Sequence, residues 1–293
     1  MQSKFMELAT SANALIAIGL ALKVKLQAEP DDPALMDQVA QVVDALGLTK
    51  SMEALTKPQA ATMLANIRGD LLLGVRVLCD DKTTSEWEHD QAELLQTFGE
   101  VSAGFPKVLK SKIGPELYGL LERLEKPGAR FLDIGTGVAE LSIAMVRQWP
   151  SLEVLGIEPW EPSLAIGFRN VTEAGLEEKI ELRKSRAEAL TEFDAFDLAW
   201  VPSAFIPSHS LPSVLERVSN ALKAGGWLLL ARPHHDSEPL ARATAHFRTV
   251  LWGGGPLSCE DAEEHLNKAG LHDVRSVSMP PGAPIAVTIG RCK

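Results

Sequence analysis

The sequence contains few cysteines, and they do not follow a pattern that builds a disulfide framework or a zinc site. Its 293 residues include only Cys79, Cys259 and Cys292, an odd number with no CxxC spacing. Such sparse cysteines are typical of a protein kept in a reducing compartment. We therefore expect a cytoplasmic protein that binds no metal through thiolates.

Basic residues are also scarce relative to acidic ones. The chain has 29 Lys and Arg against 39 Asp and Glu, which gives a formal net charge of −10. An acidic protein repels the phosphate backbones of DNA and RNA. The composition therefore disfavours nucleic acid as a partner.

The sequence also lacks a continuous apolar run long enough to span a membrane. Ala14–Leu22 is apolar, but it covers nine residues and is followed by Lys23 and Lys25. A transmembrane helix needs about 20 predominantly apolar residues. We expect a buried helix here, with no signal peptide and no membrane partner.

The first part of the chain shows helical periodicity and no convincing strand pattern. Breaks between the periodic stretches fall at Pro30-Asp-Asp-Pro33, Gly47 and Asp80-Asp-Lys82. We predict an all-helical accessory domain over residues 1–110, with helices at about 8–27, 34–46, 58–79 and 86–98.

From residue 130 onward, short apolar runs alternate with amphipathic stretches. This alternation predicts a parallel sheet with helices on both faces, in a domain over residues 111–293. Two final runs flank Pro280-Pro-Gly-Ala-Pro284 and predict an antiparallel hairpin. Strands are expected near 130–134, 153–158, 179–183, 196–201 and 226–231, and helices near 138–148, 162–174, 210–223 and 260–269.

The segment Phe131-Leu-Asp-Ile-Gly-Thr-Gly-Val-Ala-Glu-Leu141 is the most informative stretch. Asp133 ends an apolar run, and Gly135 and Gly137 follow before a helical pattern begins. Glycines allow a sharp turn and close approach to a ligand, and a helix N-terminus offers free N–H donors. Glu158 ends the next predicted strand, where a carboxylate can accept hydrogen bonds from ribose hydroxyls.

Two nucleoside cofactors fit such a unit, and the glycine spacing distinguishes between them. A dinucleotide fingerprint needs a third small residue, but Glu140 occupies that position. Asp133 and Glu140 would both place negative charge beside a pyrophosphate. The spacing therefore disfavours a nicotinamide-dependent oxidoreductase, which we keep as an alternative.

Residues 128–290 resemble the class I S-adenosylmethionine-dependent methyltransferases. Phe131–Ala139 resembles the first motif of that family, with Ala139 in place of its last glycine, and Glu158 matches the acid that holds the ribose. Lys184–Leu190 lies where the family contacts adenine, with Arg186 in place of its usual acid, and Leu222–Leu230 resembles the passage into the fifth strand. The resemblance implies a Rossmann-like doubly wound sheet and S-adenosyl-L-methionine as cofactor. It implies cofactor contacts at Asp133, Gly135, Thr136, Gly137, Glu158, Pro159, Arg186, Ala187 and Trp200.

The sequence says less about the methyl acceptor than about the cofactor. Histidine is the usual general base near neutral pH, so His209, His234 and His235 are candidates for removing a proton from the acceptor. Val201-Pro-Ser-Ala204 replaces the tetrapeptide that family members acting on amides and exocyclic amines carry after strand four. The resemblance therefore favours a small-molecule acceptor, apolar or aromatic in character.

Two questions stay open at this point. A protein of this fold can bind the cofactor without transferring methyl groups, as a cyclase or as an assembly partner. The helical part is a lid over the acceptor pocket, a unit for homodimer formation, or both.

Overall fold

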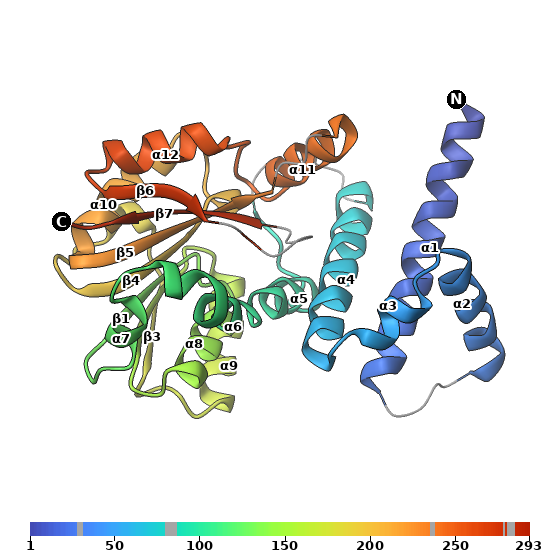
Figure 1. Ribbon diagram of the computed structural model, residues 1–293, viewed down its shortest axis with the longest axis horizontal. Coiled ribbons are helices and arrows are strands. Elements are labelled where there is room, and N and C mark those ends of the chain that lie inside the picture. Colours follow the sequence, from blue (N-terminus) through green and yellow to red (C-terminus); the bar gives the residue numbers. More distant parts are fainter. Residues whose placement is uncertain (28–31, 80–86, 235–237, 278, 280–284) are drawn as a thin grey trace. The chain divides into compact units, whose positions relative to one another are not determined.

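The computed structural model describes residues 1–27, 32–79, 87–234, 238–277, 279 and 285–293 (Figure 1). The chain divides into two compact units. The first comprises residues 1–81 and 96–104, and the second comprises residues 82–95 and 105–293. The division expected near residue 110 stays a prediction, since the second unit also includes residues 82–95.

The first unit is helical, as predicted. Asp32 caps the second helix by accepting a hydrogen bond from Leu35 N at 3.1 Å, and Pro33 occupies its first turn, where no N–H is needed. Lys25 Nζ donates to the carbonyls of Met52 and Glu53 at the end of the third helix. The helices are α1 (Gln2–Leu26), α2 (Pro33–Ala45), α3 (Thr49–Ala54), α4 (Lys57–Cys79) and α5 (Ala92–Ser102), whose second half belongs to this unit.

Helix α1 extends over 25 residues, and its apolar stretch is longer than the nine-residue run that the sequence suggested. By length and composition it is the one helix among the described residues that could cross a membrane. Only 17% of this apolar stretch is buried, so the structure does not confirm the buried helix expected here. A single apolar helix near the N-terminus is weak support for a membrane span, since core helices and signal sequences pass the same test. The expectation of no membrane partner stays a prediction.

The second unit contains a seven-stranded sheet in the order β3-β2-β1-β4-β5-β7-β6. β1 to β5 pair in parallel, whereas β7 runs antiparallel to β5 and to β6. The doubly wound sheet and the terminal antiparallel hairpin are confirmed. The strands are β1 (Arg130–Ile134), β2 (Glu153–Ile157), β3 (Ile180–Arg183), β4 (Phe196–Pro202), β5 (Leu222–Pro233), β6 (His272–Val277) and β7 (Ile285–Arg291).

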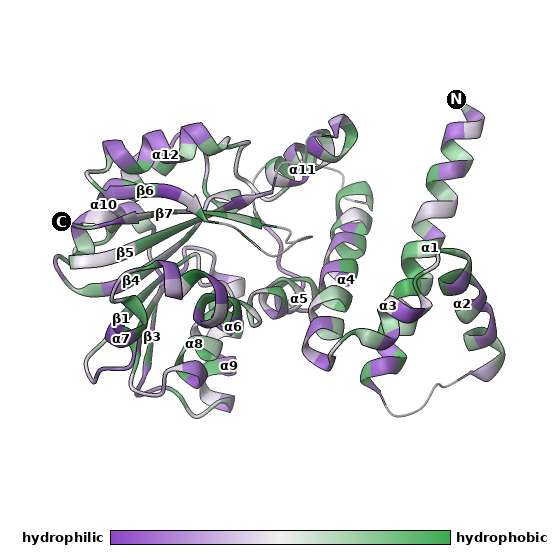
Figure 2. Ribbon diagram, viewed as in Figure 1, coloured by the Kyte–Doolittle hydropathy of each residue, from purple (hydrophilic) through white to green (hydrophobic). Residues whose placement is uncertain are grey.

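Helices cover both faces of this sheet. Side chains such as Phe131 and Leu229 pack with α8 and α9 on one face, while Leu132 and Leu230 pack with α10 and α12 on the other. In Figure 2 hydrophobic colour follows the central strands, and α12 is largely hydrophilic. The helices are α6 (Phe105–Val108), α7 (Leu120–Leu124), α8 (Glu140–Gln148), α9 (Glu161–Glu173), α10 (Leu211–Ala221), α11 (Pro239–Leu251) and α12 (Cys259–Lys268).

The helices differ from the prediction in two ways. The helix expected from residue 86 begins at Ala92, and α3, α6, α7 and α11 were not predicted. In α11, Glu238 caps the helix through Ala241 N and Pro239 occupies the first turn. The sequence signal was weak because only Ala245 and Thr249 of this helix are buried.

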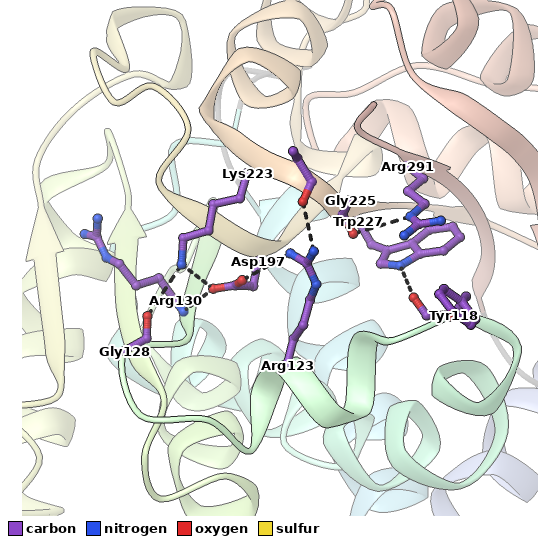
Figure 3. Close-up of polar contacts among 10 residues, drawn as sticks. Tyr118, Arg123, Gly128, Arg130, Asp197, Lys223, Gly225, Trp227 and Arg291 are labelled. Carbon is purple, nitrogen blue, oxygen red and sulfur yellow. Dashed lines mark hydrogen bonds and ion pairs between the residues drawn. The ribbon is translucent and has the colours of Figure 1, made fainter.

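A buried carboxylate ties together the edge of the sheet where the parallel strands begin (Figure 3). Asp197, near the start of β4, is 6% exposed. Its Oδ2 accepts hydrogen bonds from Lys223 Nζ at 2.7 Å and from Arg130 N at 2.9 Å. The Arg123 guanidinium lies 3.6 Å from Oδ1. The carboxylate therefore joins β1, β4, β5 and α7 at one point.

We predict that Asp197→Asn lowers the free energy of unfolding by about 1–3 kcal/mol, because it leaves buried donors with a weaker acceptor. Urea unfolding of the full chain measures this change. Glu264→Gln is a matched control, since its pair with Lys268 is exposed and should leave the unfolding midpoint unchanged. Equal midpoints for Asp197→Asn and the unsubstituted chain would contradict the account.

Candidate active site

The turn between β1 and α8 forms the base of the candidate site. Gly135, Gly137 and Ala139 all have positive φ, at 64°, 58° and 66°. Thr136 N donates to the carbonyl of Ile157 at 3.1 Å, which fixes the turn against the end of β2. Ala139 therefore keeps the left-handed conformation expected for the glycine that it replaces. The backbone at Gly135 is exposed and open to a ligand.

Asp133 lies beneath this turn, with its side chain 1% exposed. Its Oδ2 accepts hydrogen bonds from Thr136 Oγ1 at 2.9 Å and from Ser142 Oγ at 2.6 Å. Burial raises the pKa of this carboxyl to about 6, although the two hydroxyl hydrogen bonds lower it. The carboxylate thus holds the turn to the first part of α8. A contact with the amino acid end of a cofactor stays a prediction.

Glu158 joins the turns that follow β1 and β2. Its Oε2 accepts a hydrogen bond from Gly137 N at 3.0 Å, and its Oε1 accepts one from Trp160 N at 2.8 Å. Burial raises the pKa of this carboxyl to about 7, against the lowering effect of the two backbone hydrogen bonds. Each carboxylate oxygen can accept a second hydrogen bond, so capacity for two ligand hydroxyls is left.

Space beside the glycine turn is limited by α9. A Cβ atom on Gly167 would lie 3.1 Å from the Gly137 carbonyl oxygen. Glycine at this position therefore lets α9 approach the turn closely. The open turn, the remaining acceptor capacity of Glu158 and this close approach fit a nucleoside with a diol.

The remaining predicted cofactor residues lie outside the glycine turn. Pro159 and Arg186 are exposed, and Ala187 is buried at the start of a short 3-10 turn. Trp200 is 8% exposed and packs on Phe105, with ring centroids 4.3 Å apart. The structure thus places Trp200 in the hydrophobic core, and the cofactor contacts of these residues stay predictions.

Known proteins match the part of the chain that carries this turn. Residues 131–226 match a family model described as a methyltransferase domain. Demethylmenaquinone methyltransferase of Thermus thermophilus is 32% identical over 108 residues, which are 36% of this chain and 48% of that protein. U6 snRNA (guanine-N(2))-methyltransferase of Bos taurus is 26% identical over 170 residues, which are 56% of this chain and 33% of that protein.

Solved structures extend the similarity in fold to the whole chain. Human N-acetylserotonin methyltransferase in complex with SAM has a TM-score of 0.61 and 14% identity, over 99% of this chain and 97% of that chain. Residues 131–226 therefore match a methyltransferase domain, and the chain has the fold of these S-adenosylmethionine-dependent methyltransferases. The chain spans less than half the length of the curated relatives it matches, from 23% to 48%.

The structure describes two of the three candidate histidines. His209 is exposed just before α10, and His234 is exposed just after β5. In the part of the chain that the structure describes, neither is bonded to Asp133 or Glu158. His235 lies outside the described residues.

The structure also brings together aromatic side chains that the sequence did not connect. We call Trp87, Phe205 and Trp252 the aromatic cluster. The Trp87 ring meets Phe205 edge-on with centroids 5.2 Å apart, and Phe205 stacks on Trp252 at 5.1 Å. Trp87 also packs against a small buried cluster of Leu95, Val138 and Ile166, and Val138 directly follows Gly137. The cluster therefore adjoins the glycine turn, where the parallel strands end.

Sequence reasoning missed this cluster because its members are far apart along the chain. Each comes from a different segment: Trp87 precedes α5, Phe205 follows β4 and Trp252 follows α11. Trp160 Nε1 donates to the carbonyl of His89 at 2.6 Å and so anchors the segment with Trp87.

The pKa of Glu158 predicts a pH-dependent affinity. The ionised carboxylate is the better acceptor for ribose hydroxyls, so binding should strengthen as pH rises through about 7. We expect the Kd for S-adenosylhomocysteine to fall by about tenfold between pH 6 and pH 8. Calorimetry over this range measures the effect.

Two variants test whether Glu158 causes this dependence. Glu158→Gln should remove it, whereas Glu153→Gln, at the exposed opposite end of β2, should keep it. Because the folded pKa exceeds the unfolded value of 4.5, Glu158 should also destabilise the fold as pH rises from about 4.5 to about 7. A flat affinity profile for the unsubstituted chain would refute the assignment.

Proposed function

We propose that this protein transfers a methyl group from S-adenosyl-L-methionine to a small molecule with a flat, apolar or aromatic surface. The observation that carries the proposal is the proximity of two features. Glu158 and the glycine turn suit the cofactor's nucleoside, and Trp87 of the aromatic cluster packs against the buried group that contains Val138, the residue after Gly137. Aromatic side chains favour flat apolar partners through stacking and edge contacts.

In this mechanism the protein mainly binds and orients the reactants. The bound cofactor supplies an activated methyl group on a sulfonium. Glu158 would accept the ribose hydroxyls, and the Gly135–Gly137 backbone would lie against the amino acid end, with Asp133 fixing the turn from below. Alignment of the acceptor with the methyl group then lowers the activation barrier, because the reactants have already lost their translational and rotational entropy on binding.

Proton removal concerns only acceptors whose nucleophile carries a proton. His209, His234 and His235 are our candidates for that general base. Aromatic contacts of the acceptor, rather than a base held at the glycine turn, would then set specificity. We expect no metal in the reaction, and among the described residues no group of three or more His, Cys, Asp or Glu is placed to hold one.

The wider context of the enzyme is also part of the proposal. We infer that residues 1–110 act as an acceptor lid or a homodimerisation unit and that residues 111–293 carry the transfer. Exposed apolar side chains on α1, such as Phe5 at 68% and Met6 at 61%, support self-association. The net charge of −10 and the sparse cysteines support a cytoplasmic enzyme that does not act on nucleic acid.

Methyl transfer can be tested directly by mass spectrometry. The full chain is incubated with S-adenosylmethionine and a panel of phenols, quinols and aromatic amines. We expect one panel member to gain a single methyl group while S-adenosylhomocysteine accumulates in equal amount. Cofactor binding without any methylated product would instead indicate a binding protein, a cyclase or an assembly partner of this fold.

The aromatic cluster predicts where acceptor specificity lies. Phe205→Leu should raise the KM for the acceptor found in that panel by about tenfold, since an aromatic contact contributes about 1 kcal/mol or more. The Kd for S-adenosylhomocysteine should stay unchanged, which also shows that the variant is folded. Phe193→Leu, at an exposed phenylalanine before β4, is the control. An unchanged KM in Phe205→Leu would remove the cluster from the acceptor site.

A further inference from the structure

A cavity of about 500 Å³ lies beyond the end of β5, next to α11 and the start of α12. Arg232, His234, Arg242 and His246 line it, together with Ser258. None of these residues belongs to the glycine turn or to the aromatic cluster. The methyl-transfer proposal makes no use of Arg232.

Arg232 is placed in an unusual environment for a guanidinium. Along β5 the alternate residues Leu228 and Leu230 face the apolar layer formed with α10 and α12. Arg232 continues this row and is only 7% exposed. Among the described residues it has no hydrogen-bond or ion-pair partner, and its Nε is fully buried. A buried cation without a partner is costly, so an anion from outside the chain would stabilise it.

The other buried or half-buried cations of the second unit show the contrast. Lys223 pairs with Asp197, and Arg183 pairs with Glu181 and Glu192. Arg232 forms no ion pair with a carboxylate among the described residues, although two carboxylates also line the cavity. An anionic ligand would therefore compensate its charge.

The surroundings of Arg232 add further donors. Arg242 brings a second positive charge from α11. The N-terminus of α12, a ten-residue helix, adds free N–H groups and the positive end of its dipole. Two carboxylates, Glu260 and Asp261, also line the cavity. Asp261 is engaged locally, since its Oδ2 accepts from Ser258 Oγ at 2.8 Å and its N donates to that hydroxyl.

We propose that this cavity binds a small oxyanion, a carboxylate or a phosphate group, held by the guanidinium of Arg232. The planar guanidinium matches the paired oxygens of either group. The group belongs either to the methyl acceptor or to a free anion that occupies the cavity independently. The site itself does not depend on methyl transfer, so either proposal can fail without the other.

The test uses thermal unfolding of the full chain with inorganic phosphate or acetate as probe. At tenfold excess over Kd, the better probe should raise the unfolding midpoint of the unsubstituted chain by about 3 °C. Arg232→Met should abolish this shift, and Arg217→Met, at an exposed arginine of α10, should keep it.

The unfolding temperature without added anion tests whether the charge of Arg232 lacks a partner within the protein. Without added anion, Arg232→Met should unfold at a higher temperature than the unsubstituted chain, because it removes an unpaired buried charge. Equal shifts by phosphate and acetate in all three proteins, or no shift in any, would overturn the proposal. A lower midpoint for Arg232→Met would overturn it as well, since Arg232 would then stabilise the chain on its own.

The acceptor found by mass spectrometry distinguishes the two sources. A KM raised tenfold or more in Arg232→Met, with kcat retained, assigns the anion to the acceptor. An unchanged KM together with a lost probe shift assigns the cavity to a free anion. Both results support the site, and the probe measurements decide it without any methyl transfer.

Discussion

The bridge made by Glu158 is the interaction on which the candidate site depends. One carboxylate accepts the N–H of Gly137 from the β1 turn and the N–H of Trp160 from the β2 turn. It therefore fixes the two loops relative to each other at the candidate site. Burial raises the pKa of this carboxyl to about 7, so its charge changes near neutral pH.

The buried carboxylate that joins the strands lies at the opposite edge of the sheet from the candidate site. Asp197 joins strands at the edge where the parallel strands begin, while Asp133 and Glu158 lie where strands end. Ligands of open α/β sheets bind at the carboxyl ends of strands. Substitutions at the two edges should therefore have separable effects on stability and on binding. Arg232 differs from both groups, because its buried charge has no partner among the described residues.

Much of the second unit could be predicted from the sequence, because buried parallel strands have continuous apolar runs with polar ends. β1 agrees with its predicted range, and Asp133, Gly135, Gly137 and Glu158 meet at one turn as their strand-end positions indicated. Local patterns were enough there, since each strand end and glycine turn is encoded within about ten residues.

Other features depend on contacts between distant segments and could not be predicted. Ser142 bonds to Asp133 only because the turn brings α8 back over β1. Phe205 and Trp252 stack across 47 positions of sequence, and no local pattern links them. α11 was missed because little of it is buried, which leaves a weak apolar stripe.

The most direct test of the account is calorimetric titration of the full chain with S-adenosylhomocysteine at pH 8. The account predicts one binding site per chain, with affinity lost in Glu158→Ala and retained in Glu153→Ala. Absence of binding, or equal binding by the two variants, would contradict the assignment of the glycine turn and Glu158 to the cofactor.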